Sequence, residues 1–511
     1  MTRTLRARSL PWKRLVLAFG LVNACLYACF LPLWEGFDEP FHYAYVQSLA
    51  TRHLPVFGKA KVSQEIVSSF QNVPLSRFLS GPTGMLSFEE WWILPASERL
   101  ARISRWVDPA LRYQESNLNN YEAQQAPLAY MLLVPFDLAL SQVQLRYRIL
   151  ALRLLAAVTS ALLLFFAISK FDGTDARFLW SAMACVFCSQ MLWATVAHIG
   201  NDYLAVPLTV FFLVLLGSRR AFLLAIVLGL GLLTKAYFLA FTPVFIAFVF
   251  IRRRWLTVFI PLLIAGPWYW RNYLLYGSLS GTQQSVTGIS FRQALSALPK
   301  IPWPASIVAF LHWSLWTGNW SFLSFSQATL NLELILAGIG LILYFLRWRA
   351  ISPLDWWRLA AYACFLAALV YQTCVTYIHT HGASLFAEPW YWQGIVCFLW
   401  VLAFRGFQSS ALPGRLLALA TVLLTAWVAA VTYVGKLFPL YSTGFERATL
   451  KRVWTWWTTH PAQDLKTVAL APPLVLFVLL GLFLLILAVQ TWLLGASLTR
   501  MKAARRITAR D

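Results

Sequence analysis

The stretch Leu33-Trp34-Glu35-Gly36-Phe37-Asp38-Glu39-Pro40-Phe41-His42-Tyr43 follows directly on the first long apolar run of the chain. Three carboxylates and an imidazole stand within eight residues, from Glu35 to His42. Ionisable groups at the boundary of a membrane are costly and tend to mark functional sites. This stretch, residues 33–43, is called the acidic turn below, and it predicts a site at a membrane surface.

The composition is that of a polytopic membrane protein. Of the 511 residues, 59% are hydrophobic and only 12% are charged, whereas soluble domains carry about 25% charged residues. The formal charge of +22 raises the question of nucleic acid binding. The Lys and Arg residues, however, stand mostly in short runs between apolar segments, which is typical of topology signals and contacts with anionic headgroups. We therefore expect membrane lipids, and no nucleic acid, as partners.

The positions of the basic residues predict the topology. Five of them precede or begin the first apolar run, which lacks a small-residue cleavage pattern and so predicts an uncleaved span with a cytoplasmic N-terminus. Arg219-Arg220 and Arg252-Arg253-Arg254 predict two further cytoplasmic turns. Counting back from these turns places residues 35–148 outside, provided that the apolar run 127–141 is interfacial or re-entrant.

The predicted fold class is an all-α polytopic membrane protein with about twelve transmembrane helices and both termini cytoplasmic. The long first extracytoplasmic loop should contain interfacial helices. In chain order we expect the N-terminus and first span (1–34), that loop (35–148), a transmembrane core (149–272), a second extracytoplasmic region (273–328), C-terminal transmembrane helices (329–434), a third outer segment (435–469), and the last span with a basic cytoplasmic tail (470–511).

In this topology the unusual polar groups converge on the extracytoplasmic side. Asp38, Glu39, Glu122 and Asp202 suit a general base and oxygen ligands for a divalent cation, Mg²⁺ or Mn²⁺. Lys235 and Arg271 suit a phosphate or pyrophosphate group. Acids and cations that face each other at a lipid boundary favour a lipid-phosphate substrate.

Five motifs occur along the first 280 residues or so, in one order and on one predicted side. They are Gly36-Phe-Asp38-Glu39-Pro-Phe-His42, Tyr121-Glu122-Ala-Gln-Gln125-Ala-Pro-Leu128, Asn201-Asp202-Tyr-Leu-Ala205, Leu232-Leu-Thr-Lys235 and Trp268-Tyr-Trp-Arg271-Asn272-Tyr-Leu-Leu-Tyr276-Gly277. With these motifs the chain resembles the GT-C superfamily of membrane glycosyltransferases, nearest to the family 39 type and related bacterial membrane proteins. Where that family commonly has a Gly-Arg-Tyr-like element, this chain has Glu388-Pro-Trp-Tyr-Trp-Gln-Gly394.

The resemblance implies transfer of a hexosyl or pentosyl group from a polyprenyl-phosphate donor to an acceptor hydroxyl, with inversion. It makes Asp38 the general base and gives Glu39 a catalytic role, positioning the acceptor or a metal. Glu122 and Asp202 would orient substrate or complete a metal site, and Lys235 and Arg271 would bind the donor phosphate. The further candidate substrate-binding residues are His42, Gln125, Asn272 and Tyr276.

Two other functions use similar side chains. A transporter or flippase of a lipid-linked anion would bind the same groups, although inverted repeats are expected of it and the chain shows none. A polysaccharide polymerase or ligase that uses polyprenyl-linked sugar is kept open by Arg447, Lys451 and Arg452 of the third outer segment. The acceptor is a lipid, glycan or protein hydroxyl, and the expected location is a bacterial inner (cytoplasmic) membrane with the site facing the periplasm or exterior.

Overall fold

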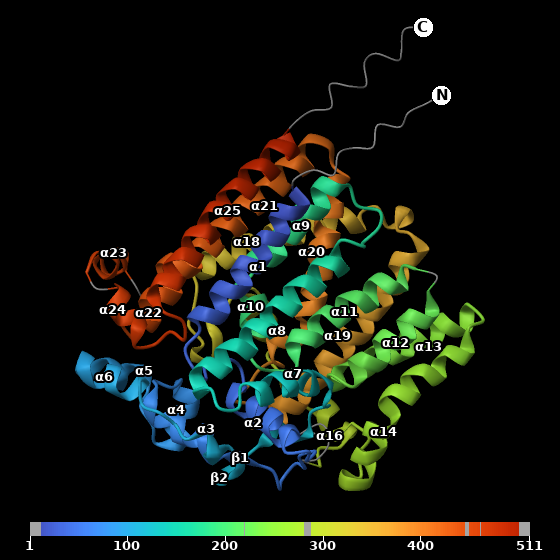
Figure 1. Cartoon of the computed structure of the whole chain (residues 1–511). Helices are drawn as coiled ribbons and strands as arrows, with labels where there is room; N and C mark the ends of the chain where they lie inside the picture. Colours follow the sequence, from blue (N-terminus) through green and yellow to red (C-terminus); the bar gives the residue numbers. More distant parts are fainter. Residues whose placement is uncertain (1–11, 219, 281–287, 445–448, 460, 500–511) are drawn as a thin grey trace.

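Long helices form a bundle, and a layer of short helices covers one of its ends (Figure 1). The computed structural model describes residues 12–218, 220–280, 288–444, 449–459 and 461–499. Some basic residues on which the predicted topology and functions depend lie outside these ranges. They are the arginines before residue 12, Arg219, Arg447 and the basic C-terminal tail. Within the described ranges, six helices are long and apolar enough to cross a membrane, or up to eight if each bent pair is one span. The prediction of an α-helical membrane protein is confirmed, and the count of about twelve spans stays a prediction.

The six long helices are distributed along the whole chain. In the helix that spans residues 411–441, the segment Thr432–Leu437 is wound as a π-helix, more loosely than an α-helix. The helix is regular again from Phe438 to Tyr441. They are α1 (Trp12–Phe30), α8 (Leu145–Ile168), α18 (Gln327–Phe345), α19 (Pro353–His379), α21 (Ala411–Val431) continued by η10 (Thr432–Leu437) and α22 (Phe438–Tyr441), and α25 (Pro473–Thr499).

Two pairs of helices are bent rather than straight. The apolar run 177–197, within the predicted transmembrane core, forms a pair of helices that bends by 64°, because the chain leaves the helix at Ser189, which has an extended backbone. A second pair bends by 100° within the predicted outer region 273–328. The pairs are α9 (Ala176–Cys188) with α10 (Gln190–Val196), and α16 (Phe291–Ser296) and η6 (Leu298–Lys300) with α17 (Trp303–Leu315).

Shorter helices complete the bundle. The run 127–141 forms only the 12-residue α7, which is short of the ~20 residues that cross a bilayer, and it packs against α2. The other elements of the bundle are α7 (Leu128–Ala139), α11 (Asp202–Leu216), α12 (Ala221–Leu232), η4 (Ala236–Phe241), α13 (Thr242–Ile251), η5 (Trp255–Val258), α14 (Phe259–Tyr276), η7 (Asn319–Ser321), η8 (Trp348–Ala350), η9 (Pro389–Trp392) and α20 (Gln393–Gln408).

The covering layer consists of residues 39–124, and two small helices from late in the sequence, within residues 450–466, lie beside it (Figure 1). Its two strands pair antiparallel, with Lys61 opposite Asn119. Its elements are α2 (Glu39–Ala50), β1 (Lys61–Ser63), α3 (Gln64–Ser69), η1 (Phe70–Asn72), α4 (Arg77–Thr83), α5 (Phe88–Ile93), α6 (Ala96–Ile103), η2 (Pro109–Tyr113), β2 (Glu115–Asn119) and η3 (Tyr121–Gln124); the small helices are α23 (Leu450–Thr458) and α24 (Pro461–Lys466).

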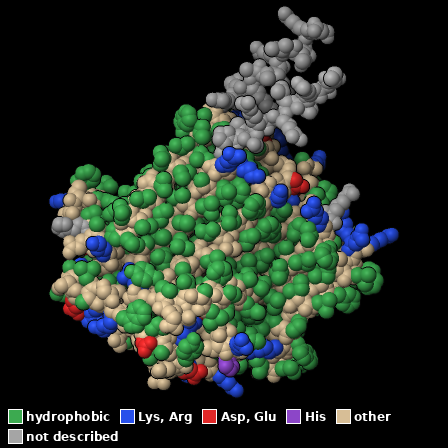
Figure 2. Space-filling view, in the orientation of Figure 1, with side chains coloured by type: hydrophobic (Ala, Val, Ile, Leu, Met, Phe, Trp, Pro, Cys, Tyr) green, Lys and Arg blue, Asp and Glu red, His purple; other side chains and the backbone are tan. Residues whose placement is uncertain are grey.

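The surface matches this division. Figure 2 shows hydrophobic side chains as a broad band across the middle of the visible face, with most Lys and Arg side chains above and below it. Apolar side chains on the outside of a bundle are expected where lipid replaces water as the solvent. The band therefore marks the part of the bundle that lies within the membrane.

Buried ion pairs attach the covering layer to α8. Arg153 forms a two-pronged ion pair with Glu39 at the start of α2, and its guanidinium also bonds the carbonyl oxygens of Leu31 and Pro32. Arg148, one turn and a half earlier, pairs with Glu65 of α3. All four ionic side chains are fully buried, so the orientation of the layer on the bundle is set by charge pairing as well as by apolar packing.

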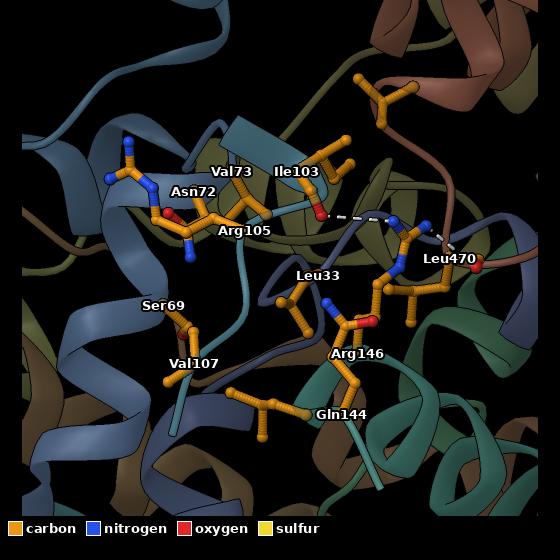
Figure 3. Close-up of a pocket in the computed structure, with 12 residues that line it drawn as sticks. Leu33, Ser69, Asn72, Val73, Ile103, Arg105, Val107, Gln144, Arg146 and Leu470 are labelled. Carbon is orange, nitrogen blue, oxygen red and sulfur yellow. Dashed lines mark hydrogen bonds between the residues drawn. The ribbon is translucent and has the colours of Figure 1, made fainter. Parts of the chain in front are cut away.

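A small cavity lies near these ion pairs. Figure 3 shows the residues that line this cavity, between the end of the first span, the covering layer and the segment before α25. The cavity has a volume of about 30 Å³. Arg146 crosses it, because its guanidinium donates to the carbonyl oxygens of Ile103 at 3.4 Å and Leu470 at 3.3 Å. The space is about that of one water molecule, so this cavity is a packing gap and not a ligand site.

The Glu39–Arg153 pair gives the first testable prediction. Replacing Arg153 by Met leaves a buried carboxylate without its cation, which should cost about 3–5 kcal/mol of stability and lower the Tm of the purified protein. The double variant Arg153→Met, Glu39→Gln should recover most of the loss. Arg102→Met, which removes a partly exposed pair with Glu98, should cost about 1 kcal/mol or less. An Arg153→Met protein as stable as the wild type would contradict the anchoring role.

Candidate functional site

A cavity of about 330 Å³ lies between η3, η4, α14 and α19. Among its described lining residues, the only acidic and basic side chains are those of Glu122 and Lys235. No residue of the acidic turn is among the described lining residues, but Asp38 interacts electrostatically with both Lys235 and Glu122. The remaining wall is mainly aromatic and apolar, with Trp268, Phe365 and Leu369 among its members. A cavity that combines one small charged region with a long apolar wall suits an amphiphilic ligand.

Lys235 is held in place between a carboxylate and an aromatic ring. Its Nζ lies 2.6 Å from both oxygens of Asp202 and 4.8 Å from the centre of the Tyr391 ring. The lysine is only 7% exposed, and a buried ammonium requires such partners. Both Asp202 at the start of α11 and Lys235 before η4 are thus brought together, as the sequence predicts.

Asp38 is presented by a constrained turn. It precedes α2 with a left-handed backbone (φ 54°), and two residues earlier the Cβ of any side chain at Gly36 would lie 2.6 Å from Cβ of His198. The Tyr121 hydroxyl donates a short hydrogen bond to Oδ1 of Asp38. Burial raises the pKa of Asp38 to about 6, against the opposing effects of the Tyr121 hydrogen bond and the Lys235 charge.

Glu122 is the least satisfied acid of the site. Its backbone N–H donates to Oδ1 of Asn120 at 3.0 Å, which fixes η3, but its Oε2 is buried without a hydrogen-bond partner among the described residues. Burial, and secondly the negative charge of Asp38, raise the pKa of Glu122 to about 8. Near neutral pH this carboxyl is therefore protonated, and it can donate a hydrogen bond to a ligand.

His42 and Gln125 support this group. His42 Nδ1 lies 2.8 Å from the Tyr130 hydroxyl and 3.8 Å from Oε2 of Glu122, and burial lowers the pKa of His42 well below its usual value. The side chain of Gln125 lines the cavity and accepts a hydrogen bond from Asn201 at 3.0 Å. Gln125 lines the cavity and His42 is not among its described lining residues, and the assignment of both to substrate binding stays a prediction.

Glu39 and Asp202 do not fit the predicted metal site. The two oxygens of Glu39 are engaged by Arg153 and by the Ile199 backbone N–H, and those of Asp202 are engaged by Lys235. Within the part of the chain that the structure describes, no group of three or more His, Cys, Asp or Glu side chains could hold a metal ion. The geometry gives Glu39 a structural ion pair in place of a catalytic or metal-binding position.

The predicted residues of α14 lie at the edge of the site. Arg271 donates to the Pro55 carbonyl at 3.0 Å, and Tyr276 accepts a hydrogen bond from the backbone N–H of Phe57 at 3.0 Å. Asn272 is fully buried, and neither polar atom of its amide has a partner among the described residues. Trp268, one turn before Asn272, lines the cavity, so Asn272 belongs to the same face of α14.

Sequence reasoning missed a contribution from residues 388–391. The Trp390 ring stacks on Phe37 of the acidic turn with centroids 4.3 Å apart, while Tyr391 covers Lys235. Burial and then the charge of Asp38 raise the pKa of Glu388 to about 8. The aromatic residues in Glu388–Gly394 are conspicuous in the sequence, but Phe37, on which Trp390 packs, lies about 350 residues earlier.

Glu35 was likewise without an assigned role. This acid is 1% exposed and accepts hydrogen bonds from the Ser321 backbone N–H at 2.6 Å and the Tyr441 hydroxyl at 2.7 Å. Burial raises its pKa to about 7. Glu35 thus ties the acidic turn to two late segments of the chain.

The pH dependence of stability tests the environment of Glu122. Since its pKa rises from 4.5 to about 8 on folding, the associated stabilisation is complete below the unfolded pKa and is lost as the pH rises through about 8. Gln does not ionise, so Glu122→Gln should have a higher Tm than the wild type at about pH 9, and this advantage should vanish at about pH 5.

A matched control is Glu115→Gln, which changes an exposed acid of β2. Its Tm difference from the wild type should be small and independent of pH. If Glu122→Gln behaved in the same way as this control, the assigned pKa of Glu122 would be wrong.

Comparison with known proteins adds no relative. No family model matches the chain, no curated protein matches it, and no solved structure matches it. The resemblance to the GT-C superfamily therefore rests on the five sequence motifs. What the cavity binds is inferred from its own side chains.

Proposed function

We propose that the chain is an integral-membrane inverting glycosyltransferase that moves a sugar from a polyprenyl-phosphate donor to an acceptor hydroxyl. The supporting observation is the cavity next to Asp38, in which Lys235 is the cation, Glu122 is a protonated acid and the rest of the described wall is mainly apolar. A phosphate on a long hydrocarbon chain matches both parts of such a cavity, since the phosphate needs a cation and the chain needs apolar surface.

The proposal includes the orientation of the chain. The start of α1 and the end of α25 lie at one end of the bundle and the covering layer lies at the other (Figure 1). With about twelve spans and cytoplasmic termini, as the basic turns favour, the covering layer and the site face the periplasm or exterior of a bacterial inner membrane.

In this reaction Lys235 binds the donor phosphate. Asp202 keeps the ammonium in position in the absence of ligand, and the Tyr391 ring stabilises it from a second side. As the bond between the anomeric carbon and the phosphate oxygen breaks, negative charge on the leaving polyprenyl phosphate increases and its attraction to Lys235 becomes stronger. An interaction that strengthens in the transition state accelerates the reaction.

Asp38 is the general base of the proposed reaction. It takes the proton of the acceptor hydroxyl while the acceptor oxygen forms a bond to the anomeric carbon, in a single displacement that inverts configuration. With a pKa of about 6, Asp38 is mostly ionised at neutral pH and more basic than an ordinary aspartate, as suits a base near neutral pH. The protonated Glu122 donates a hydrogen bond to the donor from the cavity wall.

Replacing Asp38 by Asn tests the base. We expect transfer to fall by about 10²–10⁴-fold, while membrane insertion and Tm stay near wild-type values because the side chain keeps its size. In a deletion strain complemented with Asp38→Asn, lipid analysis should find an accumulated polyprenyl-phosphate sugar, as in the deletion itself. For the wild type, kcat/KM should rise with pH with a midpoint at about 6. Wild-type turnover by Asp38→Asn would contradict the assignment.

Replacing Lys235 tests donor binding. The double variant Lys235→Met, Asp202→Asn avoids leaving a buried carboxylate unpaired, so it should fold. Its KM for the donor should rise about 10–100-fold, the loss expected for one charge-assisted hydrogen bond. The control Asp202→Asn alone keeps the ammonium and should change this KM much less. An unchanged KM in the double variant would show that the phosphate binds elsewhere.

A further inference from the structure

A second large cavity lies at the opposite end of the bundle from Asp38. It has a volume of about 470 Å³ and lies where α18 and α20 end and α19 begins. The loop between α8 and α9 forms another part of its wall through Asp172 and Gly173. None of the residues assigned to the transferase site lines it.

The floor of this cavity is an ion-pair network that is already satisfied. Arg358 and Arg405 both pair with Asp355, at 2.6 Å and 2.9 Å, and Arg358 also pairs with Asp172 at 3.0 Å. Arg405 further donates to Thr174 at 2.7 Å. With all of these groups engaged, the floor offers a fixed framework, and a ligand would be bound by the side chains around it.

Arg347 is the cation available for a ligand. It is exposed, and among the described residues the one hydrogen bond of its guanidinium runs from Nη2 to the Ser409 carbonyl at 2.5 Å. Tyr344 stands three residues earlier, on the same side of the end of α18. Its buried hydroxyl oxygen lies next to the Arg405 guanidinium, which can only donate, and its O–H donates to no described residue. The Arg347 guanidinium and the O–H of Tyr344, which line one cavity, form a donor set for the oxygens of a phosphate.

The surface next to the cavity is apolar. Ile342 and Leu346 on α18 are 61% and 71% exposed, and the neighbouring Trp348 is 58% exposed. Exposed aliphatic residues followed by Trp and Arg are typical of a helix that leaves the hydrocarbon region for the headgroup layer. A ligand at Arg347 would therefore have its phosphate among headgroups and apolar chains within reach of α18.

We propose that this cavity binds the phosphate headgroup of an anionic phospholipid, with Arg347 and Tyr344 as its donors and the acyl chains along α18. Basic pockets between membrane helices bind such headgroups, and anionic lipids are attracted to clustered cations at a membrane surface. The site is separate from the proposed donor cavity and does not depend on the reaction assigned there.

The test uses the full chain in nanodiscs of phosphatidylcholine with phosphatidylglycerol, followed by native mass spectrometry of the lipid that stays bound. Wild type should retain phosphatidylglycerol, and Arg347→Gln should weaken its retention about tenfold, the effect of losing one charge-assisted contact. Tyr344→Phe keeps the ring and should weaken it less. The control Arg254→Gln removes an exposed cation that does not line the cavity and should retain phosphatidylglycerol as the wild type does.

Equal retention by Arg347→Gln and Arg254→Gln would overturn the proposal. If Arg347→Gln failed to fold, Tyr344→Phe would decide, because retention equal to the wild type in that variant would also overturn the site. A second arm adds inorganic phosphate to the protein in phosphatidylcholine alone. A rise in Tm with phosphate that needs Arg347, without retention of phosphatidylglycerol, would show a site for free phosphate and overturn the lipid assignment.

Discussion

The arrangement depends on two arginines of α8 that pair with acids of the covering layer inside the protein. Arg153 binds Glu39 and Arg148 binds Glu65, and all four side chains are shielded from solvent. Removing such charges from water costs several kcal/mol for each ion unless the partner is in place. The layer therefore has one favourable position on the bundle, and the start of α2 is held where the first span ends.

This anchoring separates the roles of two adjacent acids. Glu39 is paired with Arg153, whereas Asp38 accepts a hydrogen bond from Tyr121 and is acted on by the charges of Lys235 and Asp202. Burial and, to a smaller extent, the charge of Asp202 raise the pKa of Asp38 to about 6, while the Tyr121 hydrogen bond and the charge of Lys235 oppose the rise. A rigid ion pair thus positions a reactive carboxylate one residue away.

Much of the site was predictable from the sequence because polar residues in apolar surroundings are conspicuous. The acidic turn, Glu122, Asp202 and Lys235 each interrupt or border an apolar run, and the structure brings them together. The role of Glu39 was not predictable, since the sequence does not show that Arg153, within an expected span, reaches it. Tyr391 and Trp390 pack on residues far away in the chain, and only the fold reveals such pairs.

Local sequence patterns also did not predict where helices bend, because tertiary packing decides this as well. The apolar run 177–197 has the length of one span, yet its chain turns at Ser189, and composition gives no signal for the 64° angle. In the same way, Tyr276 and Nη2 of Arg271 carry groups suited to a ligand, but they bond the covering layer at Phe57 and Pro55. Nη1 of Arg271 has no partner among the described residues. Tertiary partners decide whether a polar group is free to bind.

The central claim is that the cavity beside Asp38 holds a lipid-linked phosphate sugar. The most direct measurement is a cryo-EM structure of the full-length protein with a polyprenyl-phosphate sugar. The account predicts the phosphate within hydrogen-bonding distance of Lys235 Nζ, the isoprenoid chain along Trp268 and Phe365, and the anomeric carbon on the side of Asp38. Density for the donor at another place, with Lys235 still bound only to Asp202, would contradict it.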